Sequence, residues 1–92
     1  MNNKVLVSVE IPEISSKFEV FLPVNEQIWK ISKLICKIAS DLVGGNLDIK
    51  SNYVIINKND GTMYQSNMLL IETNIRNGSE LIMLNKSVNQ QQ

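Results

Sequence analysis

The chain has 92 residues, 43% of them hydrophobic, which suits one small domain with a modest core. Nine basic and nine acidic residues give a formal net charge of zero, so the chain lacks the basic field needed to bind nucleic acids or anionic membrane surfaces. It contains no histidine, and Cys36 is its single cysteine. These counts exclude a Ser-His-Asp or Cys-His arrangement, an internal disulfide and a multi-cysteine zinc site within this chain.

The first two predicted elements are strands joined as a hairpin. Hydrophobic residues alternate with others from Val5 to Ile11 and again from Phe18 to Leu22, which is the period-2 pattern of half-buried strands. Pro12 and Pro23 follow the two runs and end them, since proline cannot donate to a strand ladder. The short polar connection between the runs predicts a hairpin.

An amphipathic helix is predicted next. Asn25 is the expected N-cap, because its side-chain oxygen can accept a backbone N–H of the first turn. Gly44–Gly45 is expected to end the helix, since glycine adopts the left-handed cap conformation easily. Cys36 flanks the apolar stripe as a partly buried residue, and three lysines form a solvated face. The stripe consists of Ile28, Ile31, Ile35, Ile38 and Leu42, and the lysines are Lys30, Lys33 and Lys37.

Three short strands are predicted after the helix, over residues 53–56, 62–64 and 80–84. Asp60–Gly61 and Asn77–Gly78 mark turns, and Leu47 and Ile49 are anchors in the polar connection after the helix. A hairpin, a helix and further strands predict an α+β fold in which a mixed sheet packs on one helix, with the first and last strands side by side. We expect this domain to cover residues 4–84 and a disordered polar tail to cover 85–92.

This element order resembles that of ubiquitin, and the second half of the chain strengthens the resemblance. Residues 69–81 look like the short turn and last strand of ubiquitin-like folds, in which an aliphatic residue, here Ile75, fills the core before the final strand. The runs over residues 54–58 and 75–84 are similar to those of the YukD/EsaB family, the small ubiquitin-like proteins of type VII (WXG100, Ess-type) secretion loci.

The resemblance implies a ubiquitin-like β-grasp fold and a non-enzymatic adaptor or regulatory component of a type VII secretion machine. The implied partners are its proteins, such as the cytoplasmic part of a membrane ATPase or an accessory membrane protein, with no cofactor. No apolar run approaches the roughly 20 residues that span a bilayer, and the N-terminus carries no signal-peptide pattern. We therefore expect a cytoplasmic protein, held at the inner face of the membrane only through partners.

Two alternatives stay open. A sulfur carrier or covalent protein modifier of the ubiquitin type needs a C-terminal Gly-Gly, whereas this sequence ends in three glutamines and its Gly44–Gly45 pair is internal. We therefore expect no such activity. The second alternative is a self-associating structural module, such as a homodimer.

The outer face of the sheet is the main predicted binding surface. Leu81 and Met83 are expected to face the helix and their neighbours to face outward, because side chains alternate along a strand. In the preceding strand, Val54 and Ile56 are expected to face the core and Ile55 to face outward. An exposed aliphatic cluster of this kind indicates an interaction site. The predicted protein-binding residues on this face are Ile55, Ile82, Leu84 and Leu6.

Trp29 is the remaining predicted protein-binding residue. It lies at the edge of the helical stripe, either as the rim of the core or as an exposed anchor for a partner, since tryptophan is frequent in binding hot spots. Lys33 and Cys36 fall on the same side of the helix and would extend such an anchor into a strip. No catalytic, cofactor-binding or metal-binding residue is predicted.

Overall fold

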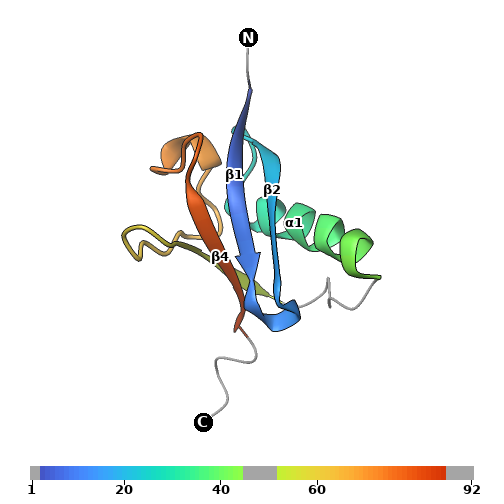
Figure 1. The fold of residues 1–92 in the computed structure, drawn as a ribbon. Coiled ribbons are helices and arrows are strands. Elements are labelled where there is room, and N and C mark those ends of the chain that lie inside the picture. Colours follow the sequence, from blue (N-terminus) through green and yellow to red (C-terminus); the bar gives the residue numbers. More distant parts are fainter. Residues whose placement is uncertain (1–2, 45–51, 87–92) are drawn as a thin grey trace.

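Four strands and one helix make up residues 3–44 and 52–86, the part of the chain that the computed structural model describes. The elements are β1 (Lys4–Ile11), β2 (Ser16–Pro23), α1 (Ile28–Val43), β3 (Tyr53–Asn57) and β4 (Glu80–Asn85). Short 3-10 turns lie at Pro12–Ile14 and Leu70–Glu72. Figure 1 shows α1 crossing one face of the sheet, with β1 and β4 in front of it.

The sheet is mixed and has the strand order β2-β1-β4-β3. β1 pairs with β2 in antiparallel and with β4 in parallel orientation, and β3 pairs with β4 in antiparallel orientation. The prediction that the first and last strands lie side by side is therefore confirmed, as is the α+β class with one helix on a mixed sheet. The strand expected over residues 62–64 is reduced to an isolated bridge between Ile56 and Met63.

Helix α1 begins later than predicted, and its start is capped by a distant segment. The N-cap is Gln27 and not Asn25, and no side chain caps the first turn. Instead, the N–H groups of Ile28 and Trp29 donate to the C=O groups of Met68 (2.8 Å) and Ser66 (3.0 Å). These tertiary hydrogen bonds satisfy N–H groups that have no partner within a helix.

The end of α1 follows the prediction. Gly44 has a φ of 88°, in the left-handed region, and its N–H donates to the C=O of Ser40. Glycine carries no Cβ penalty in this conformation, which explains why the helix stops here. Gly45, Leu47 and Ile49, for which predictions were also made, lie outside the described residues.

The core lies between α1 and the sheet. Ile75 is 1% exposed and fills the core before β4, as predicted. Two expectations for the helix were wrong. Cys36 is fully buried, and Leu42, near the C-terminal end of the stripe, is 62% exposed, because the stripe outruns the sheet that it covers. The buried hydrophobic residues are Val7, Val9, Ile11, Leu22, Ile28, Ile31, Ile35, Cys36, Ala39, Ile55, Leu70, Ile75, Leu81 and Met83.

The side-chain orientation predicted for β3 was inverted. Ile55 is 1% exposed, whereas Val54 and Ile56 are half-buried. The register explains this result, because Ile55 lies opposite the fully buried Met83 and paired residues of antiparallel strands face the same side. Ile55 therefore belongs to the core and not to a protein-binding surface.

The last strand reaches slightly beyond the predicted domain limit. β4 includes Asn85, which is buried, and the N–H of Lys86 donates to the C=O of Asn52 (2.8 Å). The predicted disordered tail therefore starts too early by these two residues. Its remainder, residues 87–92, lies outside the described part of the chain.

Candidate protein-binding surfaces

Four half-buried aliphatic residues gather on the face of the sheet that points away from α1. Ile82 lies opposite Ile56, and Leu84 lies opposite Val54, so the four side chains share one side of the β3–β4 pair. We call Val54, Ile56, Ile82 and Leu84 the outer-face patch. Met63 extends it at the sheet edge, because it bridges to Ile56 and is 62% exposed.

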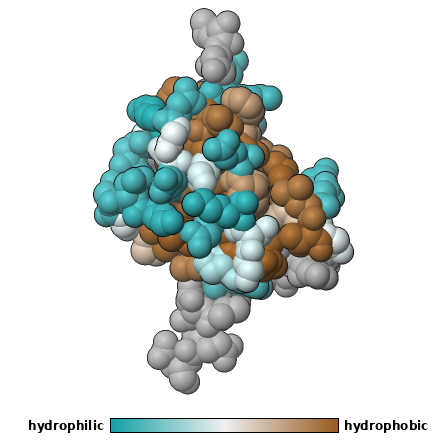
Figure 2. Space-filling view, viewed as in Figure 1, coloured by the Kyte–Doolittle hydropathy of each residue, from teal (hydrophilic) through white to brown (hydrophobic). Residues whose placement is uncertain are grey.

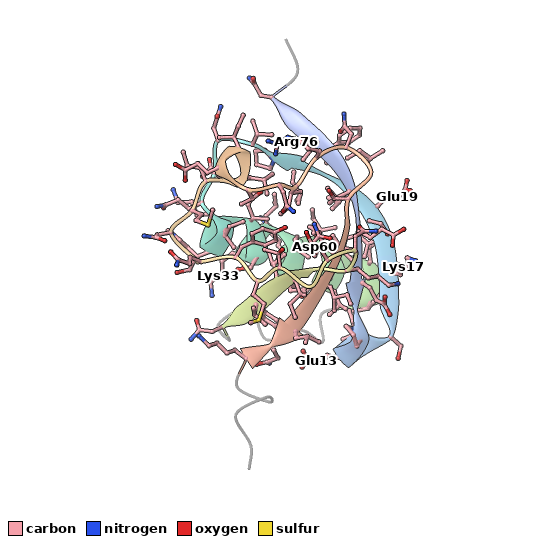
Figure 3. The ribbon with its side chains drawn as sticks, turned by 90° about the vertical axis from the view of Figure 1, so that its left-hand side faces the viewer. Glu13, Lys17, Glu19, Lys33, Asp60 and Arg76 are labelled. Atoms are coloured by element: carbon pink, nitrogen blue, oxygen red, sulfur yellow. The ribbon has the colours of Figure 1, made fainter. Side chains whose placement is uncertain are left out.

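On the same face of the sheet, polar side chains of β1, β2 and the start of β4 border the outer-face patch. Ser8 lies between Glu19 of β2 and Glu80 of β4, and Glu10 lies between Lys17 and Ile82. In Figure 2, hydrophilic residues cover much of this side of the molecule, with hydrophobic surface on either side of them. Lys17 and Glu19 project from β2 in the side view of Figure 3.

Leu6 therefore does not join Ile82 and Leu84 as predicted. It lies opposite Phe21, beyond the row that Ser8 and Glu80 form. Leu6 is half-buried, and Phe21 is 58% exposed. The two line a shallow hollow of about 520 Å³, whose rim includes Asn77, and the Asn77 Oδ1 atom accepts the N–H of Leu6 (2.8 Å).

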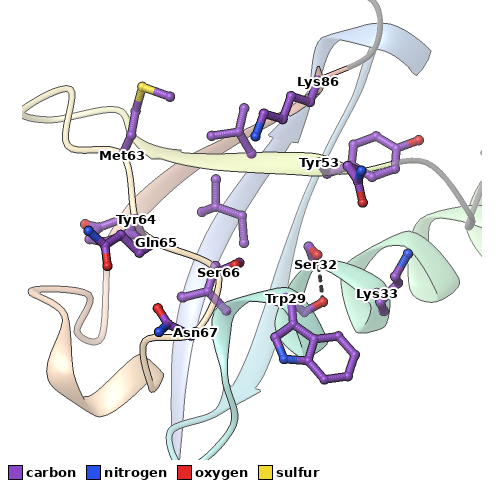
Figure 4. A pocket seen from close by; sticks show the side chains of 14 residues that line it. Trp29, Ser32, Lys33, Tyr53, Met63, Tyr64, Gln65, Ser66, Asn67 and Lys86 are labelled. Carbon is purple, nitrogen blue, oxygen red and sulfur yellow. Dashed lines mark hydrogen bonds between the residues drawn. The ribbon is translucent and has the colours of Figure 1, made fainter.

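Trp29 lines a second, larger groove, which lies at the β3 edge of the sheet. The groove runs between α1 and β3, has a volume of about 910 Å³, and is bounded by residues 63–67 and by Lys86. Figure 4 shows Trp29, Ser32 and Lys33 along its helix side and Tyr53 on β3. We call this the α1/β3 groove.

The indole of Trp29 is held in place and still accessible. It is 45% exposed, its N–H donates to the Gln27 Oε1 atom (2.9 Å), and the Lys30 Nζ atom lies 5.5 Å from the ring centroid. A cation at this distance is attracted by the ring face. Trp29 is therefore a preordered aromatic surface residue. The strip predicted from Trp29 through Lys33 to Cys36 does not form, because Cys36 is fully buried.

Several of these surface residues were not predicted from the sequence. Val54 and Ile56 were assigned to the core, and Phe21 was passed over although the alternation in its strand places it outward. Residues 63–67 carry no local pattern that would predict a groove wall. Only the pairing of distant segments brings them to α1.

A polar cluster fixes the turn after β3. The Tyr64 hydroxyl donates to the Asn74 Oδ1 atom and accepts from the Asn57 side chain (3.2 Å), and the Asn74 side chain donates to Asp60 (2.9 Å). The N–H of Thr62 donates to the Asp60 carboxylate. This hydrogen bond, together with the one from Asn74, holds the pKa of the Asp60 carboxyl below the ordinary value of 3.8. Asp60 lies at the front of the view in Figure 3. The cluster fastens the turn to the segment before β4.

Residues 3–44 and 52–86 contain neither a metal-ligand cluster nor a membrane-spanning helix. No three or more Cys, Asp or Glu side chains come together there as metal ligands. Within the same ranges, α1 is too short and too polar to cross a bilayer, and no other helix meets that requirement.

No protein-family model and no curated protein sequence matches this chain. Solved structures do match. The ubiquitin-like domain of an Arabidopsis thaliana protein superposes with a TM-score of 0.67 at 24% identity, over 99% of this chain and 86% of that one. This chain has a ubiquitin-like β-grasp fold. The ubiquitin-like domain of the Mycobacterium tuberculosis type VII secretion system protein EccD1 matches with a TM-score of 0.68 at 12% identity, over 92% of this chain and all of that one.

A third match comes from a larger assembly. A chain of the ESX-5 inner membrane complex superposes with a TM-score of 0.68 at 15% identity, over 89% of this β-grasp chain. The match spans only 21% of that longer protein. At these identities the likeness establishes the fold, and a fold alone does not determine what a protein does.

Proposed function

We propose that this chain is a protein-binding adaptor or regulatory component of a bacterial type VII (WXG100) secretion system, of the YukD/EsaB kind. The observation that carries the proposal is the near-complete superposition on the ubiquitin-like domain of EccD1, a type VII secretion protein. The match to a chain of the ESX-5 inner membrane complex supports it, since a domain of the same shape occurs within an inner membrane assembly.

The proposed role is non-enzymatic and needs no cofactor. The full sequence contains no histidine, which removes the most frequent general base and metal ligand. The thiol of Cys36 is buried in the core, so it is not placed to attack a substrate. Asp60, whose pKa is shifted, is tied to the backbone of its own turn and to Asn74. What the described surface offers is contact area for another protein.

The partner surface that we propose is the outer-face patch. Its four aliphatic side chains are half-buried, adjacent across β3 and β4, and bordered by charged residues such as Glu10 and Lys58, which form an ion pair at 3.4 Å. An apolar centre with a polar rim is the usual anatomy of a protein interface. The proposed partner is a membrane ATPase of the machine or its accessory membrane protein, which would hold this chain at the inner face of the membrane.

Affinity capture tests this function. The tagged chain, expressed in a bacterium that carries a type VII locus, is expected to recover a membrane component of that machine after detergent extraction. Recovery of no such component from a strain in which the locus is expressed would contradict the proposal. Mass spectrometry of the native C-terminus serves as the control for the alternative, since a diglycine end or a thiocarboxylate would indicate a covalent modifier or sulfur carrier.

Light scattering of the purified chain addresses the other alternative. A monomer is expected, because the outer-face patch is proposed to bind a different protein. A stable dimer that Ile56→Glu dissociates would instead assign the patch to self-association.

A further inference from the structure

The outward-facing side chains along β4 carry charges of opposite sign at the two ends of the outer-face patch. Glu80, Ile82 and Leu84 share the outer face, because side chains alternate along the strand and the intervening ones are buried. Lys86 continues this series. Its N–H donates to the C=O of Asn52 (2.8 Å), which extends the pairing with β3, and Figure 4 shows its side chain on the side of β3 away from α1. The patch therefore has a carboxylate at one end and an ammonium group at the other.

The two end charges are available to a partner. Within the described ranges, the ion pair on this face joins Glu10 and Lys58, and neither Glu80 nor Lys86 takes part in one. Glu19 adds to the negative end, because it lies in the same cross-strand row as Glu80, two strands away. Along β4 the patch thus runs from a negative to a positive end, although the chain as a whole carries no net charge.

The position of the patch on a sheet face favours a helix as its occupant. The hydrogen-bonding groups of a sheet lie in its plane, so a partner on the face gains no backbone hydrogen bonds from it. An extended segment would leave its own backbone groups without partners there, whereas a helix pairs them internally.

The dimensions of the patch also fit a helix. Its four side chains form a two-by-two array, with about 6.6 Å between neighbours on one strand and about 4.8 Å between the strands. Residues four apart in a helix lie about 6 Å apart along the axis and on one face, so a helical stripe matches the array. The span from Glu80 to Lys86 is about 20 Å, which equals the length of about 13 helical residues.

We propose that the outer-face patch binds an amphipathic helix of the partner protein, which lies antiparallel to β4. The acidic N-terminal turn of this helix lies at Lys86, its basic C-terminal turn lies at Glu80, and its apolar stripe covers the four aliphatic side chains. In this direction the helix complements both end charges. The same direction suits the helix dipole, which favours acidic residues in the first turn and basic residues in the last.

This proposal rests on the assignment of the outer-face patch as the partner surface, and it adds the form, charge and direction of the bound segment. Its test uses the purified chain and a synthetic probe. Failure of the probe to bind overturns the helix and leaves the affinity capture result as it stands. Failure to capture a secretion component overturns the type VII function and leaves the binding of the probe as it stands.

The probe is the peptide acetyl-Glu-Glu-Ala-Leu-Gln-Ala-Leu-Leu-Gln-Ala-Leu-Gln-Lys-Lys-amide, which has leucines at the spacing of one helical face and the proposed charge order. Titration into the 15N-labelled chain is expected to shift the amide resonances of Ile56 and Ile82 and to leave that of the exposed Leu42 on α1 unchanged. A nitroxide at the peptide N-terminus is expected to broaden the Lys86 amide resonance more than the Glu80 one. No shift at millimolar probe, or broadening that is equal or stronger at Glu80, would overturn the proposal.

Charge reversal at either end tests the complementarity. Glu80→Lys and Lys86→Glu are each expected to weaken binding of the probe by at least about fivefold, because each brings like charges together. Asp41→Lys and Lys37→Glu make the same charge changes on α1, in the other layer of the molecule, and are expected to alter the affinity by less than about twofold. Unchanged affinity in the first two variants, or equal losses in the α1 variants, would overturn the proposal. If circular dichroism shows that Glu80→Lys does not fold, Glu19→Lys takes its place.

The double variant Glu80→Lys/Lys86→Glu tests the direction of the helix. Its affinity for the probe is expected to return to within about twofold of the wild-type value, because the peptide can turn end for end and meet opposite charges again. The nitroxide is then expected to broaden the amide resonance at position 80 more than that at position 86. A double variant that binds no better than the single variants, or that holds the peptide in the original direction, would overturn the proposal.

Discussion

Hydrophobic residues occur on both faces of the sheet, but they do different work on each face. Toward α1, Val9, Ile55 and Met83 are 1% exposed or less and hold the fold together. On the opposite face, Ile56 and Ile82 are half-buried and stand beside the Glu10–Lys58 ion pair. The adjacent residues Ile55 and Ile56 show that hydrophobic type alone does not separate a core position from a contact position. The face of the sheet toward which each side chain points decides which of the two positions it occupies.

Ile55→Glu should have the largest effect on stability. A carboxylate at a position that is 1% exposed has no cationic partner in the core, so we expect a loss of more than about 4 kcal/mol. That loss approaches the whole stability of a small domain. Urea denaturation followed by circular dichroism measures it. A native spectrum with an unchanged midpoint would return Ile55 to the outer face.

Truncation of two leucines in β4 sharpens the comparison. Leu81→Ala removes a side chain that is 1% exposed and should cost about 3 kcal/mol, because it leaves a cavity under α1. Leu84→Ala truncates a half-buried side chain on the other face and should cost about 1 kcal/mol. Both values come from chemical denaturation. Equal costs would mean that the two faces are equally buried.

Ile56→Glu should affect binding much more than stability. The side chain lies on the outer face, so we expect a stability loss of about 1 kcal/mol and at least a tenfold weaker affinity for the captured secretion component. Lys17→Glu, on the same face but in β2, is the matched control and should keep its affinity. Surface plasmon resonance with the purified component measures both variants. Unchanged affinity in Ile56→Glu would remove the outer-face patch as the docking surface.

The smallest expected effect is a pH dependence at Asp60. Its pKa is lowered in the folded chain, so the hydrogen bonds to its carboxylate stabilise the fold fully above 3.8, the ordinary value. This contribution is lost as the pH falls through the lower folded-state pKa. Acid unfolding of Asp60→Asn should therefore show a smaller loss of stability below pH 3.8 than the wild type does. Parallel acid curves would argue against the shift.

Much of the fold follows from local patterns. The alternation in β1 and β2, the prolines at their ends, the spacing in α1 and the glycine at Gly44 each specify one structure, and all four are observed. Ile75 was predicted from the resemblance to ubiquitin and is buried as expected. The first four of these features depend on residues close together in the sequence, whereas the Ile75 prediction depends on the resemblance.

The structural features that local sequence patterns did not predict depend on contacts with segments that are distant in the sequence. Tyr53–Ile56 is a continuous apolar run, which has no alternation to fix its phase, so only pairing with β4 shows that Ile55 is buried. The start of α1 depends on carbonyl groups of Ser66 and Met68. The α1/β3 groove combines four separate segments, and no one of them predicts it.

Site-specific photocrosslinking tests the central claim most directly. A photoreactive phenylalanine analogue replaces Leu84 in the outer-face patch or, as a control, Leu42, which is 62% exposed at the far end of α1. In cells that carry a type VII locus, we expect the Leu84 position to crosslink to a membrane component of that machine and the Leu42 position to give no such product. Crosslinks from Leu42 alone, or none from either position, would contradict the account.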